Sequence, residues 1–158
     1  MERPRETGVA WCTTMNPSSW STMSHEHTPL AYYWSSPSGN TKALADKLQC
    51  ETRPIGEGAT APYILITPTY EQPRAGNTIP PQVARWLENN HSLLVGVIGT
   101  GNRNFGGLFC RAAVDVSTTY RVPVLHRCEL RGTDADTRTI DAGIAQHFDT
   151  LTRLRGIT

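Results

Sequence analysis

The sequence lacks the features that mark several common classes of protein. Its 15 basic and 14 acidic residues leave a formal net charge of +1, so no excess of positive charge indicates a nucleic-acid surface. No apolar run approaches the roughly 20 residues that a membrane-spanning helix needs. The first residues also lack the apolar stretch of a secretory signal peptide. We therefore expect a cytoplasmic protein that binds neither nucleic acid nor membrane.

Cysteine is scarce and scattered. The four cysteines, Cys12, Cys50, Cys110 and Cys128, form no C-x-x-C pair and have no histidine at metal-ligand spacing. Such spacing is typical of reduced, buried thiols rather than of a disulfide framework. We predict no metal site.

Hydrophobic periodicity is also missing from residues 1–28, which are rich in Ser, Thr and Pro. A segment of this composition cannot bury enough apolar surface to offset its ordering entropy. We expect a disordered N-terminal extension over 1–28 and one domain over 29–155.

From residue 29 onward, short apolar runs alternate with helical patterns. The pattern predicts strands at 30–34, 51–55, 63–68, 92–99 and 122–130, and helices near 40–48, 81–89, 108–120 and 134–154. We expect the asparagine and aspartate at the helix starts to be N-caps. Alternation of this kind predicts an α/β protein with a flavodoxin-like, doubly wound, five-stranded parallel sheet. Its expected strand order is 2-1-3-4-5, with helices on both faces.

Polar or glycine-rich stretches follow the first, third and fourth predicted strands, at 35–41, 68–78 and 99–107. In this fold the three stretches lie at one edge of the sheet, where ligands bind beyond the carboxyl ends of the strands. Three converging loops are stronger evidence for a site than any single loop.

The first stretch, W-S-S-P-S-G-N-T-K at 34–42, has two interpretations. It can be a phosphate cradle at the N-terminus of a helix, or a serine-rich turn between a strand and a helix. It lacks the G-K-[ST] of a P-loop, and no G-x-G-x-x-G follows the first strand, which disfavours a dinucleotide. Neutral donors would have to hold the phosphate.

A phosphate on this first loop and a flat ring between the other two describe a site for flavin mononucleotide, FMN. Tyr70 can stack on a ring or be an ordinary half-buried loop residue, and the glycines after the fourth strand can serve the cofactor or only a sharp turn. His126 fits a hydrogen-bonded core residue. The predicted cofactor-binding residues are Ser35, Ser36, Ser38, Gly39, Asn40, Thr41, Pro68, Thr69, Tyr70, Gly76, Thr100, Gly101, Asn102, Asn104, Phe105 and Gly106.

Four further blocks carry a family resemblance: P-T-Y at 68–70, I-P-P-Q-V-A-R-W-L at 79–87, G-V-I-G-T-G-N-R-N-F-G at 96–106 and V-P-V-L-H-R-C-E-L-R-G-T at 122–133. Together with the stretch at 33–41 they resemble the NrdI family, the flavodoxin-like partners of class Ib ribonucleotide reductase. The match covers roughly 30–148. The resemblance favours the phosphate cradle over the plain turn.

The resemblance implies noncovalent FMN and docking on the small subunit of the reductase. It also implies that the reduced flavin, fed by a flavin-reducing partner, reacts with molecular oxygen. The resulting superoxide-level oxidant would help assemble a dimanganese-tyrosyl radical cofactor, so no catalytic side chain is expected. We expect Arg74 and Arg103 to contact the partner.

Two other functions remain open at this stage. A generic flavodoxin would carry electrons to several partners, but such carriers are typically strongly acidic, whereas this sequence has a pI of about 7.7. A signalling or scaffold domain of the same fold would need an acidic cluster at its first strand, which 30–34 does not supply.

Overall fold

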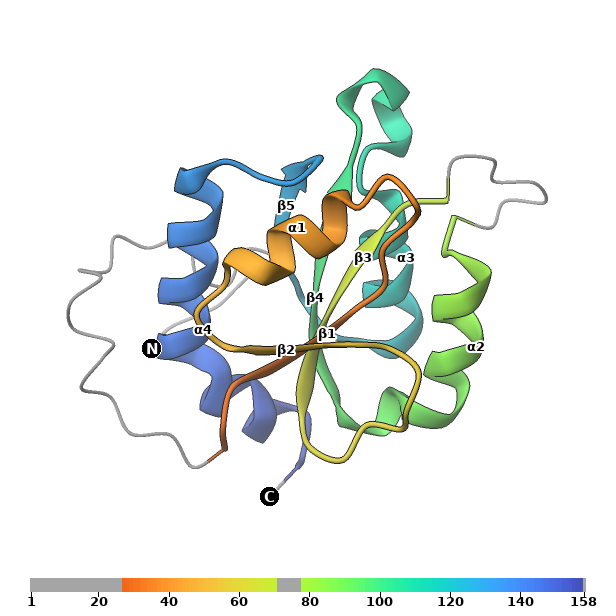
Figure 1. Ribbon diagram of the computed structural model, residues 1–158. Coiled ribbons are helices and arrows are strands. Elements are labelled where there is room, and N and C mark those ends of the chain that lie inside the picture. The colour runs from red at the N-terminus through yellow and green to blue at the C-terminus, as the bar shows by residue number, and fades with distance from the viewer. Residues whose placement is uncertain (1–26, 71–77, 158) are drawn as a thin grey trace.

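The computed structural model describes residues 27–70 and 78–157, and these form a three-layer α/β domain (Figure 1). Its elements are β1 (Leu30–Tyr33), α1 (Asn40–Lys47), β2 (Glu51–Pro54), β3 (Tyr63–Pro68), α2 (Pro81–Asn90), η3 (His91–Leu93), β4 (Leu94–Gly101), η4 (Arg103–Leu108), α3 (Arg111–Tyr120), β5 (Val124–Glu129) and α4 (Asp134–Leu154). The part of the chain described contains no helix that is long and apolar enough to cross a membrane.

The five strands form one parallel sheet in the order β2-β1-β3-β4-β5, as predicted from the sequence. Tyr63–Pro68 begins with four apolar residues, and its first five residues are buried. A strand of this composition needs cover on both faces, which explains its central place in the sheet.

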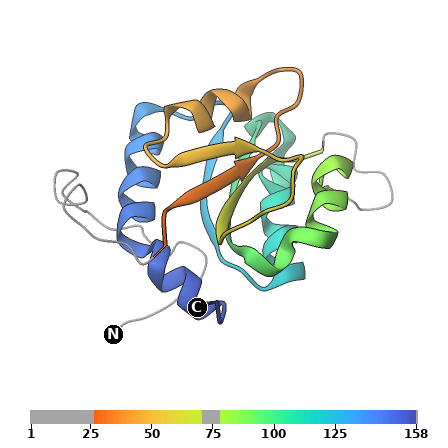
Figure 2. The same cartoon turned by 60° about the horizontal axis from the view of Figure 1, so that its bottom comes forward.

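Helices α1 and α4 cover one face of the sheet, and α2 and α3 cover the other (Figure 2). On the first face Leu44 of α1 and Phe148 of α4 pack with Ile64 and Ile66. On the second face Trp86 and Val116 pack with Leu65 and other strand residues. The two cores lie on opposite sides of β3, because successive side chains of a strand alternate between its faces.

Three local features differ from the sequence prediction. Residues 91–93 form a 3-10 turn, and β4 runs to Gly101, because its pairing with β3 and β5 continues through Thr100 and Gly101. The helix expected from 108 begins at Arg111, after the 3-10 segment Arg103–Leu108. The strand expected at 92–99 is therefore shifted toward the glycine-rich segment.

The helix caps also differ from the expectation. Asn40 is the first residue of α1, and Gly39 occupies the cap position with a φ of 77°. Helix α4 is capped by Thr133, whose hydroxyl accepts the N–H of Asp136, while the Asp136 carboxylate accepts the N–H of Thr133. This capping box fixes the start of α4 through two reciprocal bonds.

Of the predicted extension, only His27 and Thr28 are among the described residues. The backbone N–H of His27 donates to Asp149 of α4 at 3.1 Å. Cys50, Cys110 and Cys128 are free thiols, as expected, and Cys12 lies outside the described residues. Burial raises the pKa of each of these three thiols to about 12, so they are poor nucleophiles at neutral pH.

Candidate functional site

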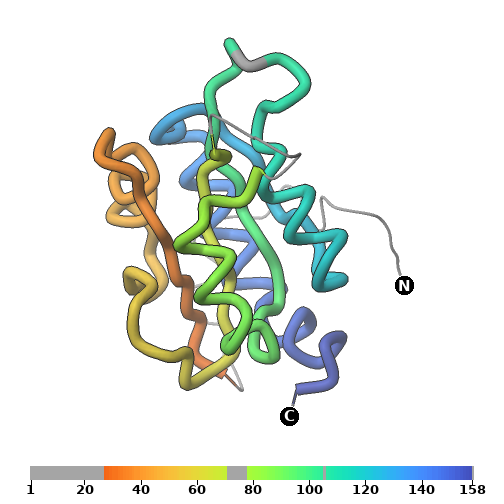
Figure 3. The backbone as a smooth tube through the Cα atoms, turned by 90° about the vertical axis from the view of Figure 1, so that its right-hand side faces the viewer, coloured from red at the N-terminus to blue at the C-terminus, as the bar shows by residue number. Residues whose placement is uncertain are grey.

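The loops after β1, β3 and β4 come together at the carboxyl edge of the sheet (Figure 3). This is the switch point of the doubly wound topology, because the chain moves from β1 outward to β2 and then back to β3 on the other side. The strand order thus places the three polar stretches beside one another.

The loop between β1 and α1 is closed by a turn in which the N–H of Gly39 donates to the carbonyl of Ser36 at 2.9 Å. The left-handed backbone of Gly39 turns the chain directly into helix α1. Gly39 has no side chain that could cap the helix, and the hydroxyl of Ser35 accepts the N–H of Lys42 at 3.2 Å. Among the described residues, the backbone N–H groups of Asn40 and Thr41 have no protein acceptor, so two donors are free at the positive end of the helix.

Four hydroxyl groups, from the first loop, the start of α1 and the end of β4, form two hydrogen-bonded pairs. Ser36 and Ser38 share a hydrogen bond of 2.8 Å near the surface. Thr41 and Thr100 share one of 2.9 Å in the interior, which fastens the start of α1 to the end of β4. Each hydroxyl can both donate and accept, so the pairs keep hydrogen-bonding capacity for a ligand.

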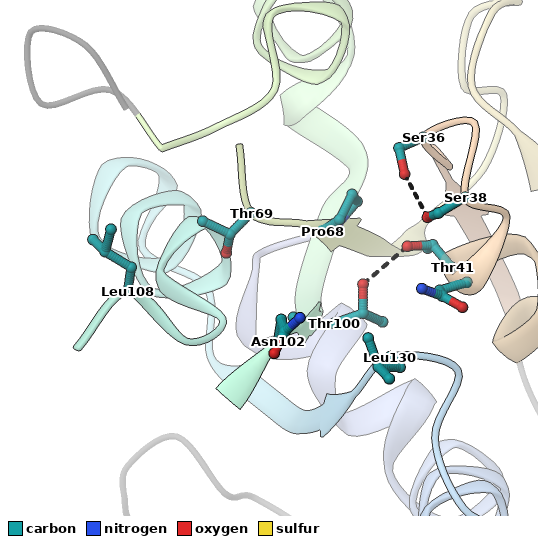
Figure 4. Close-up of a pocket in the computed structure, with 11 residues that line it drawn as sticks. Ser36, Ser38, Thr41, Pro68, Thr69, Thr100, Asn102, Leu108 and Leu130 are labelled. Carbon is teal, nitrogen blue, oxygen red and sulfur yellow. Dashed lines mark hydrogen bonds between the residues drawn. The ribbon is translucent and has the colours of Figure 1, made fainter. Parts of the chain in front are cut away.

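A pocket opens between these groups and the ends of β3 and β4 (Figure 4). In the close-up, the Ser36–Ser38 and Thr41–Thr100 pairs lie on one side and Thr69 and Leu108 on the other. The volume is about 140 Å³, below the roughly 300–1,000 Å³ typical of pockets that enclose a drug-sized ligand. The pocket is therefore too small to enclose a drug-sized ligand completely.

Beyond β3 the chain is tied to helix α3. The hydroxyl of Thr69 accepts the N–H of Ala112 at 3.0 Å, and the hydroxyl of Thr78 donates to Asp115. The N–H of Tyr70 donates to the carbonyl of Thr78 at 2.7 Å, so the two ends of segment 71–77 are joined. The Tyr70 side chain is 41% exposed, which leaves it free to meet a ligand.

Beyond β4 the chain is shaped by its glycines and by Asn102. A Cβ on Gly101 would lie 2.9 Å from the backbone nitrogen of Cys110, so only glycine fits there. The Asn102 side chain accepts the N–H of Asn104 at 2.9 Å, and Gly106 adopts a φ of 56°. Of this part of the chain, Gly101, Asn102 and Leu108 line the pocket.

Arg103 stands at the rim of this segment. Its Nε lies 3.6 Å from the carboxylate of Glu129, and its guanidinium lies 4.5 Å from the ring centre of Phe109. The side chain is 66% exposed, so this ion pair is screened by solvent and leaves Arg103 accessible.

The pocket brings together nine of the predicted cofactor-binding residues: Ser36, Ser38, Asn40, Thr41, Pro68, Thr69, Thr100, Gly101 and Asn102. Ser35, Gly39, Tyr70, Asn104 and Gly106 do not line it. The hydroxyl of Ser35 is instead used within the loop, where it accepts the N–H of Lys42 and donates to the Ser36 carbonyl. Gly76 and Arg74 lie outside the described residues, and for Phe105 only the backbone is described.

Two residues that line the pocket were not predicted, Leu108 and Leu130. Both are unusually exposed for leucine, at 36% and 42%. Leu130 belongs to the C-E-L-R-G-T motif, but nothing local in the sequence shows that this turn reaches the first loop. Exposed apolar side chains at a pocket mouth suit one face of a flat heterocycle.

Ionisable groups contribute little to the pocket itself. His126 donates or accepts a hydrogen bond of 2.8 Å with Asp136, away from the pocket lining, in agreement with the prediction of a hydrogen-bonded residue. Within the described ranges there is no group of three or more His, Cys, Asp or Glu residues that could hold a metal ion. The donor set, made of hydroxyls, an amide and free N–H groups, suits a phosphate monoester such as that of FMN.

Comparison with known proteins agrees with the fold and with the motifs. A family model described as "NrdI Flavodoxin like" matches residues 32–142. Protein NrdI of Ruegeria sp. (strain TM1040) is 42% identical over 124 residues, which cover 73% of this chain and 88% of the relative. Protein NrdI of Paracoccus denitrificans is 39% identical over 127 residues, 75% of this chain and 92% of the relative.

Among solved structures, a short-chain flavodoxin associated with a non-canonical PDU bacterial microcompartment has a TM-score of 0.55. Its sequence identity is 12%, and the match covers 78% of this chain and 99% of the flavodoxin. At this identity the likeness bears on the fold alone. The family match and the curated relatives go further: the chain belongs to the NrdI family of flavodoxin-like proteins.

Proposed function

We propose that this protein binds FMN noncovalently and serves as the activating flavoprotein of a class Ib ribonucleotide reductase. The observation that carries the proposal is the pocket at the ends of β1, β3 and β4, where free N–H groups and hydroxyls converge at the start of α1. Family membership supplies the link to the reductase.

The chain's own residues would bind and orient the cofactor. The N–H groups of Asn40 and Thr41 and the hydroxyls of Ser36 and Ser38 would hold the phosphate. Leu108 and Leu130, both exposed at the pocket, would offer apolar contacts to the ring. When bound, FMN would supply the redox chemistry, passing a superoxide-level oxidant or electrons to the dimanganese site of the small subunit.

In this proposal the protein acts in the cytoplasm, where a flavin-reducing partner and molecular oxygen are its other reactants. No side chain needs to act as a general acid or base. The near-neutral charge, +1 overall, also distinguishes the chain from strongly acidic electron carriers that are steered to many basic partners.

Flavin content and complex formation together test the proposal. The purified protein, or its apoprotein titrated with FMN, should show a flavin absorption spectrum with one FMN per chain. A colourless protein that takes up no FMN would contradict the cofactor assignment.

Docking is tested with the manganese-loaded small subunit by sedimentation or calorimetry. Arg103→Glu should weaken the complex while FMN binding stays unchanged, because the exposed guanidinium lies outside the pocket. Arg138→Glu, at an exposed position on α4, is the matched control and should have no effect. An unaltered complex with Arg103→Glu would place the interface elsewhere.

A further inference from the structure

Arg131 joins the C-E-L-R-G-T motif to the first loop, although 91 residues separate it from Asn40. Its Nε and Nη2 donate to Oδ1 of Asn40 at 3.3 and 3.1 Å. A guanidinium carries only donors, so the amide oxygen must be the atom that faces it. The amide Nδ2 of Asn40 is thereby turned the other way, and no acceptor for it is present among the residues that the structure describes.

The position of Asn40 makes this orientation useful. Asn40 is the first residue of α1 and lines the pocket, beside the free backbone N–H groups. An asparagine without this bond could turn its oxygen toward an anion, and an amide oxygen, which only accepts hydrogen bonds, repels phosphate. Fixing Oδ1 on Arg131 leaves a donor for the ligand.

The turn that carries Arg131 is held against the same helix. The N–H of Gly132 donates to the carbonyl of Glu129 at 2.9 Å, and the ammonium of Lys47 donates to the carbonyl of Gly132 at 3.2 Å. A Cβ at Gly132 would lie 3.1 Å from Cδ1 of Leu44, so the turn packs closely on α1. The turn is therefore held on α1 through its backbone, and the Arg131 side chain extends from it to Asn40 at the helix start.

The positive charge of Arg131 is also not neutralised by a carboxylate. Lys42, the only cation that directly follows the loop in sequence, is paired with Asp46 at 2.7 Å. The bonds of Arg131 go instead to a neutral amide, and no ion pair joins it to any carboxylate in 27–70 or 78–157. A cation on the oxygen of an amide polarises its N–H groups and makes them stronger donors to an anion.

We propose that Arg131 is a positioning residue for the phosphate end of the ligand. It acts through Asn40, whose amide N–H it aims into the pocket, and so sets the preference for a phosphorylated flavin over an unphosphorylated one. This inference rests on the proposed function, because it assumes that the pocket holds the phosphate of FMN.

The test compares FMN with riboflavin, which has the same ring and lacks the phosphate. Apoprotein of the wild type, Arg131→Ala and Arg138→Ala is titrated with each flavin, and the flavin fluorescence gives the two dissociation constants. Arg131→Ala should weaken FMN binding about tenfold and riboflavin binding less than about twofold, since one oriented, charge-assisted donor is lost at a partly exposed site. Arg138→Ala should keep the wild-type preference.

The possible outcomes distinguish a failure of this inference from a failure of the proposed function. A wild type that binds neither flavin would remove the proposed function and this inference together. If the wild type prefers FMN and Arg131→Ala keeps that preference, or loses both flavins equally, only the role of Arg131 is overturned.

A double-variant cycle tests whether Arg131 acts through Asn40. In an Asn40→Ala background, Arg131→Ala should change the preference for FMN by less than about twofold, because the group that it orients is gone. A full tenfold loss in that background would show that Arg131 works independently of Asn40, and would overturn the positioning role.

Discussion

Thr41 and Thr100 share a hydrogen bond of 2.9 Å in the interior, although 59 residues separate them in the chain. Both side chains are almost fully buried. The bond joins the first turn of α1 to the carboxyl end of β4, the two elements between which the pocket opens. A buried hydrogen bond therefore links the helix that follows the first loop to the strand that precedes the glycine-rich segment.

Removing one hydroxyl of this pair should destabilise the protein. Thr100→Val leaves the buried hydroxyl of Thr41 without its partner, which should lower the free energy of unfolding by about 1–3 kcal/mol. The double variant Thr41→Val/Thr100→Val should lose less than the sum of the two single variants. Urea denaturation followed by circular dichroism gives all four values, and strict additivity would argue that the bond contributes nothing.

Removing hydroxyl groups from the loop between β1 and α1 should lower the affinity for FMN. Ser36→Ala combined with Ser38→Ala should weaken FMN binding by about 2–4 kcal/mol, since each hydrogen bond to a charged group is worth about 1.5–3 kcal/mol. Fluorescence titration of the apoprotein measures the change, with the exposed Ser92→Ala as the control. Unchanged affinity in the double variant would mean that the phosphate binds elsewhere.

Gly101, the last residue of β4, and Gly107, in the 3-10 segment that follows, should differ sharply in their tolerance of a side chain. A Cβ at Gly101 would meet the backbone nitrogen of Cys110 at 2.9 Å, whereas a Cβ at Gly107 would meet nothing within 4 Å. Gly101→Ala should lower the melting temperature by several degrees, about 2–4 °C for each kcal/mol in a domain of this size. Gly107→Ala should change it by about one degree or less. Equal effects in thermal denaturation would contradict the close approach at Gly101.

Asp136 should make the stability depend on pH in the acid range. Burial alone would raise the pKa of its carboxyl, but hydrogen bonds from Thr133 and His126 outweigh burial, and the pKa lies below its usual value. A lowered pKa stabilises the folded state above the unfolded pKa of about 3.8, and this contribution is lost as the pH falls through the folded value.

Asp136→Asn should therefore be less stable than the wild type near pH 7, and the difference should shrink as the pH falls below about 4. Asp134→Asn, a neighbouring exposed carboxylate in the same helical turn, serves as the control. Urea midpoints measured between pH 2.5 and 7 give the comparison. A difference that stays constant over this range would show that the charge of Asp136 does not carry the effect.

The sequence predicts the sheet well because its signals are local. The continuous apolar run at 63–68 matches β3 residue for residue, and the alternation of strands with helices leads to the observed strand order. The three loops converge as expected, because the carboxyl ends of parallel strands share one edge.

What the sequence does not predict depends on contacts between distant segments. The sequence predicts that Asn40 caps its helix, but in the structure its side-chain oxygen accepts hydrogen bonds from Arg131 instead. The end of β4 at Gly101 depends on pairing with Glu129 of β5, which no local pattern contains. Leu130, with a φ of 54°, reaches the pocket through a backbone bond from its N–H to the Gly101 carbonyl at 2.8 Å.

We propose that this protein, loaded with FMN, activates the reductase rather than serving as a general electron carrier. The most direct measurement is the yield of tyrosyl radical, by electron paramagnetic resonance, when the manganese-loaded small subunit is mixed with the reduced, FMN-loaded protein and oxygen. A generic flavodoxin at the same concentration and the same degree of reduction is the control. The radical yield should be well above that of the control, and a yield no greater than the control's would contradict the role of this protein as the activator.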